Sequence, residues 1–504
     1  MVFIFLLIAV LWGGPAIAQE KSLVDILQAK GVLSKKEAQQ LRKGTAAKTG
    51  GSDQQALINL LRKKGVLEEG DLAQLQAPPA IVAVAPAPAT PEVTHWLSHL
   101  ESKQLETQAR VEAVENKKPA FTAGYEDGFF VRSADGNFSL RVGGRVAMNT
   151  LYQQEDTTQN DSFTMDRVRL YTEGFLYKYF QYKVEAEFAT SSSILRDAYL
   201  NVTYFPQADV QVGQYKVPFS YEELLSKRYT DLVERSAVIL STVNPSRDIG
   251  LMVHGRVVGG FLNYQLAVLN GSGQNTADNN SAKDLAARFV LTPFVFQKDS
   301  LLSGLNFGGA VTYGHEPKSK SIFGTSPTGY QFFKAVDVRG DRMRVGGHLA
   351  WFSGPYSLTG EYIYTSEQRQ KQGKNQVDLS DFVTQGGYIG GTWLLSGENK
   401  IFNKPNRPLL IFLDPTGKMA GWGSWELAAR YETFSLDNAG GSGEPGALKR
   451  NTFQAARLGL NWYLNPWTRV SLEYLYSLYD DAKRSPIPGH HAVNSILSRV
   501  QVEF

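Results

Sequence analysis

The chain has 504 residues, a formal net charge of only +3 and no cysteine. A charge this small, spread along the sequence, argues against nucleic acid as a partner, and the missing cysteines exclude disulfides, thiolate metal sites and cysteine nucleophiles. With 27 Phe, 23 Tyr, 8 Trp and 47 Gly, the composition favours β structure with many turns over a helical enzyme.

The first 18 residues have the features of a secretory signal peptide. An apolar run from Val2 to Trp12 precedes a small-x-small cleavage site at Ala16 and Ala18, although the usual basic residue near the start is missing. The run is too short to cross a bilayer as a helix, and no other segment of the sequence could do so. A membrane location therefore requires a closed β-barrel, because only helices and closed barrels pair all their backbone groups in lipid.

The region that follows predicts a small helical part in the periplasm. Residues 19–76 contain an internal repeat, in which 23–33 returns as 57–67, and each copy predicts a short helical hairpin. Residues 77–91 are rich in Ala and Pro and predict an extended linker. Over 92–117, apolar residues at heptad spacing predict a short coiled coil. The hairpins are either a module with a periplasmic partner or a spacer without a specific ligand.

From residue 121 to 504 the pattern changes to strands separated by turn residues. Polar and apolar residues alternate, and the apolar faces are aliphatic in the middle and often end in Tyr or Trp, which is typical of a lipid-facing barrel wall with aromatic girdles. We predict an all-β transmembrane barrel of about sixteen antiparallel strands, with fourteen or eighteen as alternatives. The candidate strands lie near 138–151, 163–176, 180–190, 196–205, 208–215, 248–257, 261–270, 283–292, 305–314, 342–352, 356–366, 382–394, 424–435, 452–463, 467–478 and 493–504.

The final strand carries a second signal, because it ends the chain with Phe504. A terminal aromatic residue on an amphipathic strand resembles the closing strand of a bacterial outer-membrane barrel. Taken alone, this strand also fits a soluble β-sandwich. The connections favour the barrel, because short periplasmic turns and long external loops alternate in such proteins. Tight connections lie near 177–179, 205–207 and 465–466, and long ones at 151–162, 216–247, 315–341, 395–423 and 436–451.

Several stretches of 121–504 resemble the phosphate-selective porin O and P family. They are 166–174 with 180–188, 195–200, the block 212–250, and, towards the end, 421–431 and 460–466; the 212–250 block is the most specific. The resemblance does not extend to the first 120 residues. It implies a homotrimer of sixteen-stranded barrels in the bacterial outer membrane, each with its own pore, and it implies that 216–247 folds inward as a constricting loop.

Basic side chains on the polar face of the predicted strands are the candidates for anion binding, because they can replace the hydration water of an anion. The residues that we expect at the constriction are Arg141, Arg145, Arg167, Arg169, Lys183, Asp197, Lys216, Arg247 and Arg288. The family's constriction motif is matched best at Arg167, Lys183 and Asp197. Where the family commonly has an arginine pair, this chain has Asp166-Arg167.

These observations predict a water-filled passive diffusion channel for small anions such as phosphate. Acids on the same face, among them Glu173 and Glu185, predict at most a modest anion preference. The alternatives are a general or sugar-type porin and an outer-membrane structural tether with an incidental pore. An enzyme is not expected, because the seven His residues, including the pair His490-His491, form no recognisable nucleophile or metal motif, and no cofactor is expected either. The expected partners are membrane lipid, small anionic solutes and further copies of the chain.

Overall fold

The computed structural model describes residues 99, 102–108, 120–190, 194–243, 246–438 and 446–504. The chain divides into two units, Met1–Glu112 and Ala113–Phe504. Of the first unit, the described residues are 99 and 102–108, which are helical. The expected signal peptide, hairpin repeats and linker lie outside the described residues, and the coiled coil expected over 92–117 stays a prediction.

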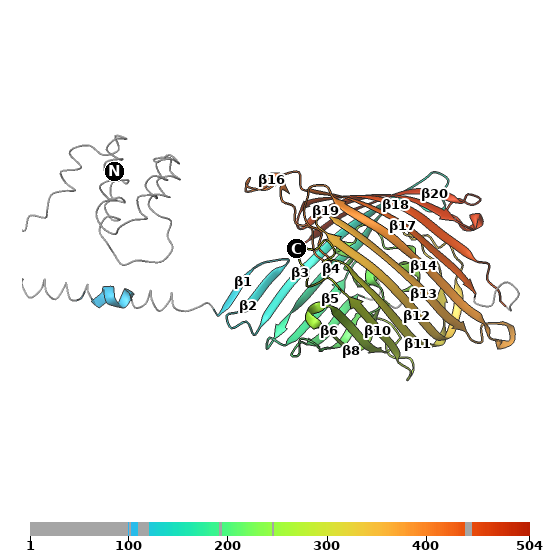
Figure 1. Ribbon diagram of the computed structural model, residues 1–504, viewed down its shortest axis with the longest axis horizontal. Coiled ribbons are helices and arrows are strands. Elements are labelled where there is room, and N and C mark those ends of the chain that lie inside the picture. The colour runs from blue at the N-terminus through green and yellow to red at the C-terminus, as the bar shows by residue number, and fades with distance from the viewer. Residues whose placement is uncertain (1–98, 100–101, 109–119, 191–193, 244–245, 439–445) are drawn as a thin grey trace, which may run out of the picture. The chain divides into compact units, whose positions relative to one another are not determined.

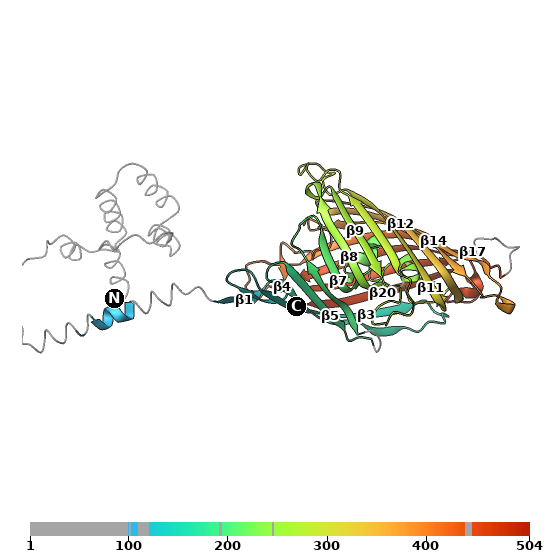
Figure 2. The same cartoon turned by 90° about the horizontal axis from the view of Figure 1, so that it is seen from below.

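The second unit is a closed barrel of sixteen antiparallel strands, as predicted (Figures 1 and 2). The barrel strands are β3 (Ser139–Gln153), β4 (Ser162–Leu176), β5 (Phe180–Glu187), β6 (Leu195–Val202), β7 (Asp209–Lys216), β8 (Arg247–Val257), β9 (Leu262–Leu269), β10 (Asp284–Leu291), β11 (Asn306–Ile322), β12 (Val336–Ser353), β13 (Tyr356–Arg369), β14 (Leu379–Leu394), β17 (Ser424–Asn438), β18 (Asn451–Asn465), β19 (Thr468–Tyr479) and β20 (Ala492–Glu503). Each matches one candidate segment, although β11 and β12 extend well beyond theirs.

Pairing of the last strand with the first one closes the barrel. β20 and β3 pair from Ser495 opposite Gln153 to Glu503 opposite Arg145, and Figure 2 shows the two strands side by side. The backbone of Phe504 then continues the ladder, because its N–H donates to the Gly144 carbonyl (3.0 Å) and its carbonyl accepts from the Gly144 N–H (2.6 Å). The terminal residue therefore completes the closing ladder.

The two faces of the wall have opposite chemistry. On β19, Leu472 and Tyr474 point outward and are about half exposed, whereas Glu473 between them is 1 % exposed and faces the lumen. This apolar-out, charged-in alternation is the reverse of a soluble sandwich and fits a barrel in a bilayer. In the described part of the chain, no helix is both long and apolar enough to cross a membrane.

Short turns identify one end of the barrel, which we call the turn end. It carries the connections 177–179, 203–208, 258–261, 354–355 and 466–467, and the carboxy-terminus lies there as well. Outward aromatic pairs lie at this end, with ring centroids 6.1 Å apart in Tyr356–Trp393 and 5.1 Å apart in Trp425–Trp462. Short turns and an aromatic girdle are typical of the periplasmic end of such a barrel.

A hairpin that the alternation pattern did not predict precedes the barrel. β1 (Phe121–Tyr125) pairs with β2 (Phe129–Ser133), and β2 pairs with β3 from Phe129 opposite Val142 to Arg132 opposite Ser139. Because β20 reaches β3 only as far as Arg145, the start of β3 would otherwise expose unpaired backbone groups. The hairpin covers this edge.

The connection 395–423 is an exception to the predicted alternation of short turns and long external loops. The strand order places it at the turn end, so its grouping with the external loops is wrong. The reason is that the up-and-down order of the strands, and not the length of a connection, decides at which end the connection lies. This connection contains the short parallel pair β15 (Ile411–Phe412) and β16 (Ala420–Gly421).

The connection between β7 and β8 folds into the lumen, as the family resemblance implies. We call residues 217–243 the inward segment; it contains α7 (Tyr221–Leu224), the 3-10 turn η1 (Lys227–Tyr229) and α8 (Ala237–Thr242). Next to α8, the connection 323–335 brings Phe332 against the inward-facing ring of Phe453, with centroids 5.2 Å apart. Phe332 and Phe453 are both fully buried, so this side of the lumen is packed with apolar side chains.

Charged groups on the wall of β13 and β17–β20 hold the inward segment. Arg457 Nη2 donates to the Glu234 carbonyl (2.7 Å), and its Nε pairs with Glu473 (2.6 Å), which in turn accepts the Val233 N–H (2.8 Å). Similar contacts join Glu361 to the N–H groups of Tyr221 and Glu222, Arg430 to the Glu222 carboxylate, Asn461 to the Asp231 carbonyl and Arg469 to the Thr230 carbonyl. Most of these groups are buried, so their partners specify one position of the segment.

We therefore expect Arg457→Met to release the inward segment while the barrel stays closed. The substitution leaves Glu473 and Glu432 without their buried partner, which costs about 3–5 kcal/mol. The measurement is limited proteolysis of the folded protein in detergent, with cleavage sites mapped by mass spectrometry. The matched control is Arg342→Met, which breaks the buried pair Arg342–Asp284 (2.6 Å) on the wall. Equal cleavage of the inward segment in both variants would contradict the anchoring role.

Candidate functional site

Two adjoining cavities lie between the inward segment and the wall of β3–β8. The loop-side cavity has a volume of about 340 Å³ and the turn-side cavity about 840 Å³. Both are lined by Arg169, Lys183 and Glu185 on the wall and by Ser226 and Asn403 opposite. Because these five residues border both, the cavities adjoin, and we call the two together the lateral passage.

The charge of the lateral passage is strongly biased in its loop-side part. Eight cationic side chains and three carboxylates line the loop-side cavity. The cations are Arg167, Arg169, Lys183, Arg196, Lys216, Lys227, Arg235 and Arg247, and the carboxylates are Glu185, Asp197 and Glu223. The turn-side cavity has seven cations against five carboxylates. A site confined by protein and rich in positive charge concentrates anions.

Carboxylates on nearby strands hold several of the wall cations in place. Arg169 on β4 pairs with Glu185 (2.7 Å) and Glu187 (2.6 Å) on β5, and Arg247 on β8 pairs with Asp197 on β6 (2.7 Å). These carboxylates are largely buried and are occupied by the pairs. The guanidinium groups are therefore held in fixed positions while the passage keeps an excess of positive charge.

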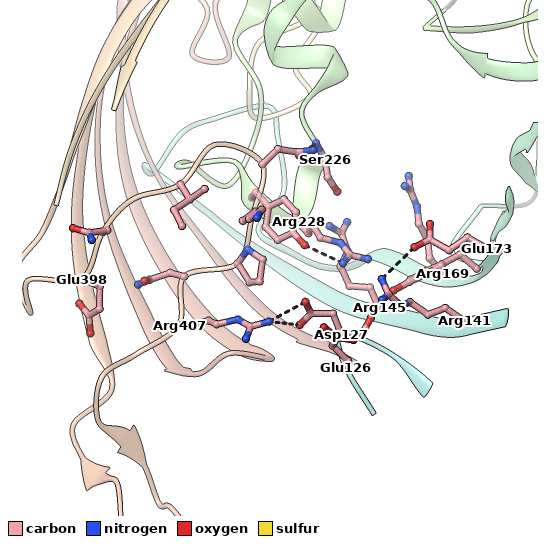
Figure 3. Close-up of a pocket in the computed structure, with 18 of the residues that line it drawn as sticks. Glu126, Asp127, Arg141, Arg145, Arg169, Glu173, Ser226, Arg228, Glu398 and Arg407 are labelled. Carbon is pink, nitrogen blue, oxygen red and sulfur yellow. Dashed lines mark hydrogen bonds and ion pairs between the residues drawn. The ribbon is translucent and has the colours of Figure 1, made fainter. Parts of the chain in front are cut away.

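Arg145 on β3 has no carboxylate partner of this kind among the described residues. Arg145 is only 4 % exposed, lines the turn-side cavity, and has no hydrogen-bond partner for Nε and Nη2 among the described residues. Figure 3 shows it beside Arg169 and Arg141, facing Arg228 of the inward segment. A buried guanidinium without an acceptor is unfavourable unless a ligand or water supplies one. Arg145 is therefore a candidate for contact with an anion.

A β-bulge at the start of β4 brings both Asp166 and Arg167 to the lumen. The register with β3 shifts at this point, where Ala147 pairs with Arg167 but Met148 pairs with Met165, so strict alternation is interrupted. Asp166 contacts Lys227 of the inward segment (2.8 Å) and Arg499 of β20 (3.0 Å). Its charge is thus used to fix the inward segment, and Arg167 remains in the lining of the loop-side cavity.

The structure brings together eight of the nine expected constriction residues. Arg167, Arg169, Lys183, Asp197, Lys216 and Arg247 line the loop-side cavity, and Arg141 and Arg145 line the turn-side cavity. Arg288 lies apart from both, on β10, where its Nη1 donates to Gln265 (3.1 Å).

The alternation pattern of the sequence did not identify several cations of the passage. Lys227, Arg228 and Arg235 belong to the inward segment, which has no strand alternation to interpret. Arg196 directly precedes Asp197 on β6, and alternation would turn only one of them inward; the register of β5 against β6 shifts beside them. Basic residues within the 212–250 block were the one available signal for the first three.

The turn-end connection borders the passage on the opposite side. Lys400 is fixed by Asp231 of the inward segment (2.6 Å) and by Glu426 of β17, and the Ser226 N–H donates to Asn403 (3.1 Å). Burial opposes the charged form of Lys400, but the two carboxylates outweigh it and raise the Lys400 pKa above its ordinary value. Residues 397–407 are therefore held inside the barrel mouth at the turn end.

The same connection also reaches the hairpin β1–β2. Arg407 pairs with Asp127 at the tip of that hairpin (3.0 Å), as Figure 3 shows. Both side chains are well exposed, so this pair adds little stability. It places the hairpin at the opening of the turn-side cavity.

A closed barrel with an inward segment and a cationic passage corresponds to a known family of proteins. The family model for phosphate-selective porin O and P matches residues 140–504. The chain belongs to the phosphate-selective porin O and P family. It is thus an outer-membrane porin, a water-filled channel of the bacterial outer membrane.

Individual relatives are distant. Porin O of Pseudomonas aeruginosa is 22 % identical over 420 residues, which cover 75 % of this porin and 91 % of that protein. An uncharacterised protein of Aquifex aeolicus is 24 % identical over 301 residues, or 56 % of this porin and 62 % of that protein. Among solved structures, the outer membrane channel DcaP of Acinetobacter baumannii is 13 % identical, with a TM-score of 0.45 over 76 % of this porin and 100 % of that chain.

The charge of the lateral passage is expected to depend on pH through Lys227. Burial lowers the pKa of the Lys227 ammonium to about 8; Glu234 and Asp166 oppose this shift, and Arg167 and Arg499 add to it. Raising the pH from about 7 to about 9 therefore removes most of the positive charge of Lys227 from the loop-side cavity. Anion selectivity, measured as the reversal potential in asymmetric salt, should fall over this range.

The matched variant is Lys227→Arg, since a guanidinium keeps its charge over this range. The fall in selectivity should be smaller in this variant than in the native porin. An equal fall in both would assign the pH dependence to other groups of the passage.

Proposed function

We propose that this porin conducts small oxyanions such as phosphate by passive diffusion through the lateral passage. The observation that carries the proposal is the excess of cations in the loop-side cavity, eight against three carboxylates, next to the unpartnered guanidinium of Arg145. The family to which the chain belongs is named for phosphate selectivity, which supports the same class of solute.

The geometry of the cations suits an oxyanion that must bind and then leave. A guanidinium offers two parallel N–H donors to an oxyanion, and successive sites along a passage allow an ion to move by small steps. Carboxylates paired with Arg169 and Arg247 reduce the net attraction at each step. A passage of this composition favours moderate anion selectivity over tight binding.

A sugar-type porin is the second candidate, and the lining of the passage argues against it. Stacking against sugar rings needs free aromatic faces. Tyr171 and Tyr229 line the turn-side cavity, but the guanidinium of Arg228 lies over both rings, at 5.5 and 5.4 Å from their centroids. The residues that line the loop-side cavity include no aromatic side chain.

The test compares two lumen arginines of which only one faces the passage. Arg145→Gln removes the unpartnered guanidinium. We expect block of the chloride current by added phosphate to weaken by at least about tenfold, because a hydrogen bond to a charged group contributes about 1.5–3 kcal/mol. Arg288→Gln is the matched control, which should leave the block unchanged. The measurement is single-channel conductance in planar bilayers, with phosphate titrated on one side.

Three outcomes would overturn the proposal. Equal effects of Arg145→Gln and Arg288→Gln would mean that solutes do not follow the lateral passage. A native current that does not respond to phosphate and shows no anion selectivity would make the protein a general porin. Absence of any current would favour the structural tether.

We also propose that the porin is a homotrimer, with the barrels in contact through a short wall. Of the six consecutive strands β5–β10, five have only 8 residues each, and β8 has 11. A transmembrane strand tilted in a barrel needs about 9–11 residues to cross the hydrocarbon. A wall this short is better covered by a neighbouring protein than by lipid, and its outward residues Val212 and Leu251 are apolar.

The absence of native cysteine makes this proposal testable with single labels. Val212→Cys on β7 and Leu458→Cys on β18 would each carry an environment-sensitive dye in vesicles that contain spin-labelled lipid. We expect strong quenching at position 458 and little at 212, together with the mass of three chains in mild detergent. Equal quenching at both positions, or a monomer mass, would contradict the trimer without affecting the proposed solute.

A further inference from the structure

An exposed apolar ribbon projects from the turn end of the barrel. Residues 409–422, which we call the turn-end ribbon, contain the paired strands β15 and β16. Leu410, Leu413, Met419 and Trp422 are large apolar side chains of this ribbon, and each is exposed, Leu413 by 80 % and Trp422 by 76 %. So many exposed apolar groups within fourteen residues indicate a surface that contacts something apolar.

The ribbon is built to hold these side chains outward. The Ile411 N–H donates to the Met419 carbonyl (2.6 Å), and the Asp414 carboxylate accepts the N–H groups of Thr416 (3.0 Å) and Met419 (2.8 Å). Leu413 has a φ of 54°, in the left-handed region that a branched side chain rarely adopts. The turn is therefore fixed by its own hydrogen bonds, with its most exposed leucine in a strained conformation.

Contacts with the barrel show where the ribbon lies. The ring of Phe412 packs edge-on against Trp462 with centroids 4.9 Å apart, and Trp462 Nε1 donates to the Trp422 carbonyl (2.7 Å). Trp462 in turn stacks on Trp425, one of the outward pairs of the aromatic girdle. The ribbon therefore continues the lipid-facing girdle of the barrel, and Figure 1 shows β16 at the same end as the carboxy-terminus.

We propose that the turn-end ribbon is a membrane anchor that inserts its apolar side chains into the phospholipid leaflet at the turn end of the barrel. Aromatic and aliphatic groups at this level prefer the boundary between headgroups and acyl chains. The exposed Lys418 of the ribbon supplies a cation for a lipid phosphate. Lipid contact also accounts for a leucine held out in a strained turn.

A second copy of the chain fits this surface less well than lipid does. The ribbon contacts β18, and six strands separate β17 and β18 from β7 and β8 in either direction around the barrel. It is thus across the barrel from the short wall. This part of the argument rests on the trimer proposed above, and the test separates the two occupants directly.

The test uses Leu413→Cys, labelled with an environment-sensitive dye in the folded full-length protein. The vesicles contain phosphatidylethanolamine and phosphatidylglycerol, with and without a spin-labelled lipid, and iodide serves as the quencher in water. Ile389→Cys, on the outer face of β14, is the lipid-exposed control, and Ala277→Cys, in the exposed connection 270–283, is the water-exposed control.

We expect spin-labelled lipid to quench the dye at position 413 to at least about half the extent seen at position 389, and iodide to have little effect there. Quenching by iodide as at position 277 would place the ribbon in water and overturn the proposal. Protection from both quenchers would overturn it as well, because it would indicate coverage by a neighbouring subunit. Since the single cysteine replaces an exposed side chain, the barrel is expected to fold in all three variants.

Discussion

Hydrocarbon offers no hydrogen-bond partner to a peptide group, and the structure of this porin depends on that constraint. Every strand of the wall must pair on both sides, so the last strand has to meet the first. The terminal residue takes part in this closure, because the Phe504 backbone bonds to Gly144 in both directions. Where β20 no longer covers β3, the hairpin β1–β2 does so. Closure in lipid also fixes the chemistry of the faces, because apolar side chains must point outward and the charges remain for the lumen.

The charged side chains of the lumen have two different roles. On the wall of β13 and β17–β20, arginines and carboxylates are used to hold the inward segment, as Arg430 does with Glu222 and Arg457 with Glu473. Buried pairs of this kind add little net stability, but each removes the freedom of its partner to lie elsewhere. Cations on β3–β8 line the space that the segment leaves open. The lateral passage is thus a consequence of which wall the inward segment is bound to.

The turn-end connection has contacts on both faces of the barrel wall. One part of it is fixed in the lumen through Lys400 and Asn403, and another part, the turn-end ribbon, packs on the outward face of Trp462. Only a long connection can cross the rim and serve both sides. The length of 395–423, which is unusual for this end of a barrel, follows from these two positions.

The sequence by itself determined the local features of this protein. A period of two residues separates a lipid face from a lumen face, so it predicted the sixteen strands and the inward direction of Arg145, Arg169 and Lys183. The amphipathic pattern of the last strand, 493–504, resembled the closing strand of an outer-membrane barrel. These features depend on neighbours in the chain or in the adjacent strand, and therefore they can be predicted from the sequence.

The tertiary structure alone decided which lumen charges act together. Alternation places Arg288, Arg457 and Arg145 alike on the lumen face. In the structure, however, Arg288 lies apart from the passage, Arg457 holds the inward segment, and Arg145 has no hydrogen-bond partner for Nε and Nη2. The sequence pattern also did not indicate the bulge at Asp166, or the end of the barrel at which 395–423 lies. Each of these outcomes depends on register, on strand order and on how a non-repetitive segment packs across the lumen. There, charged residues form contacts with residues that lie far away in the sequence.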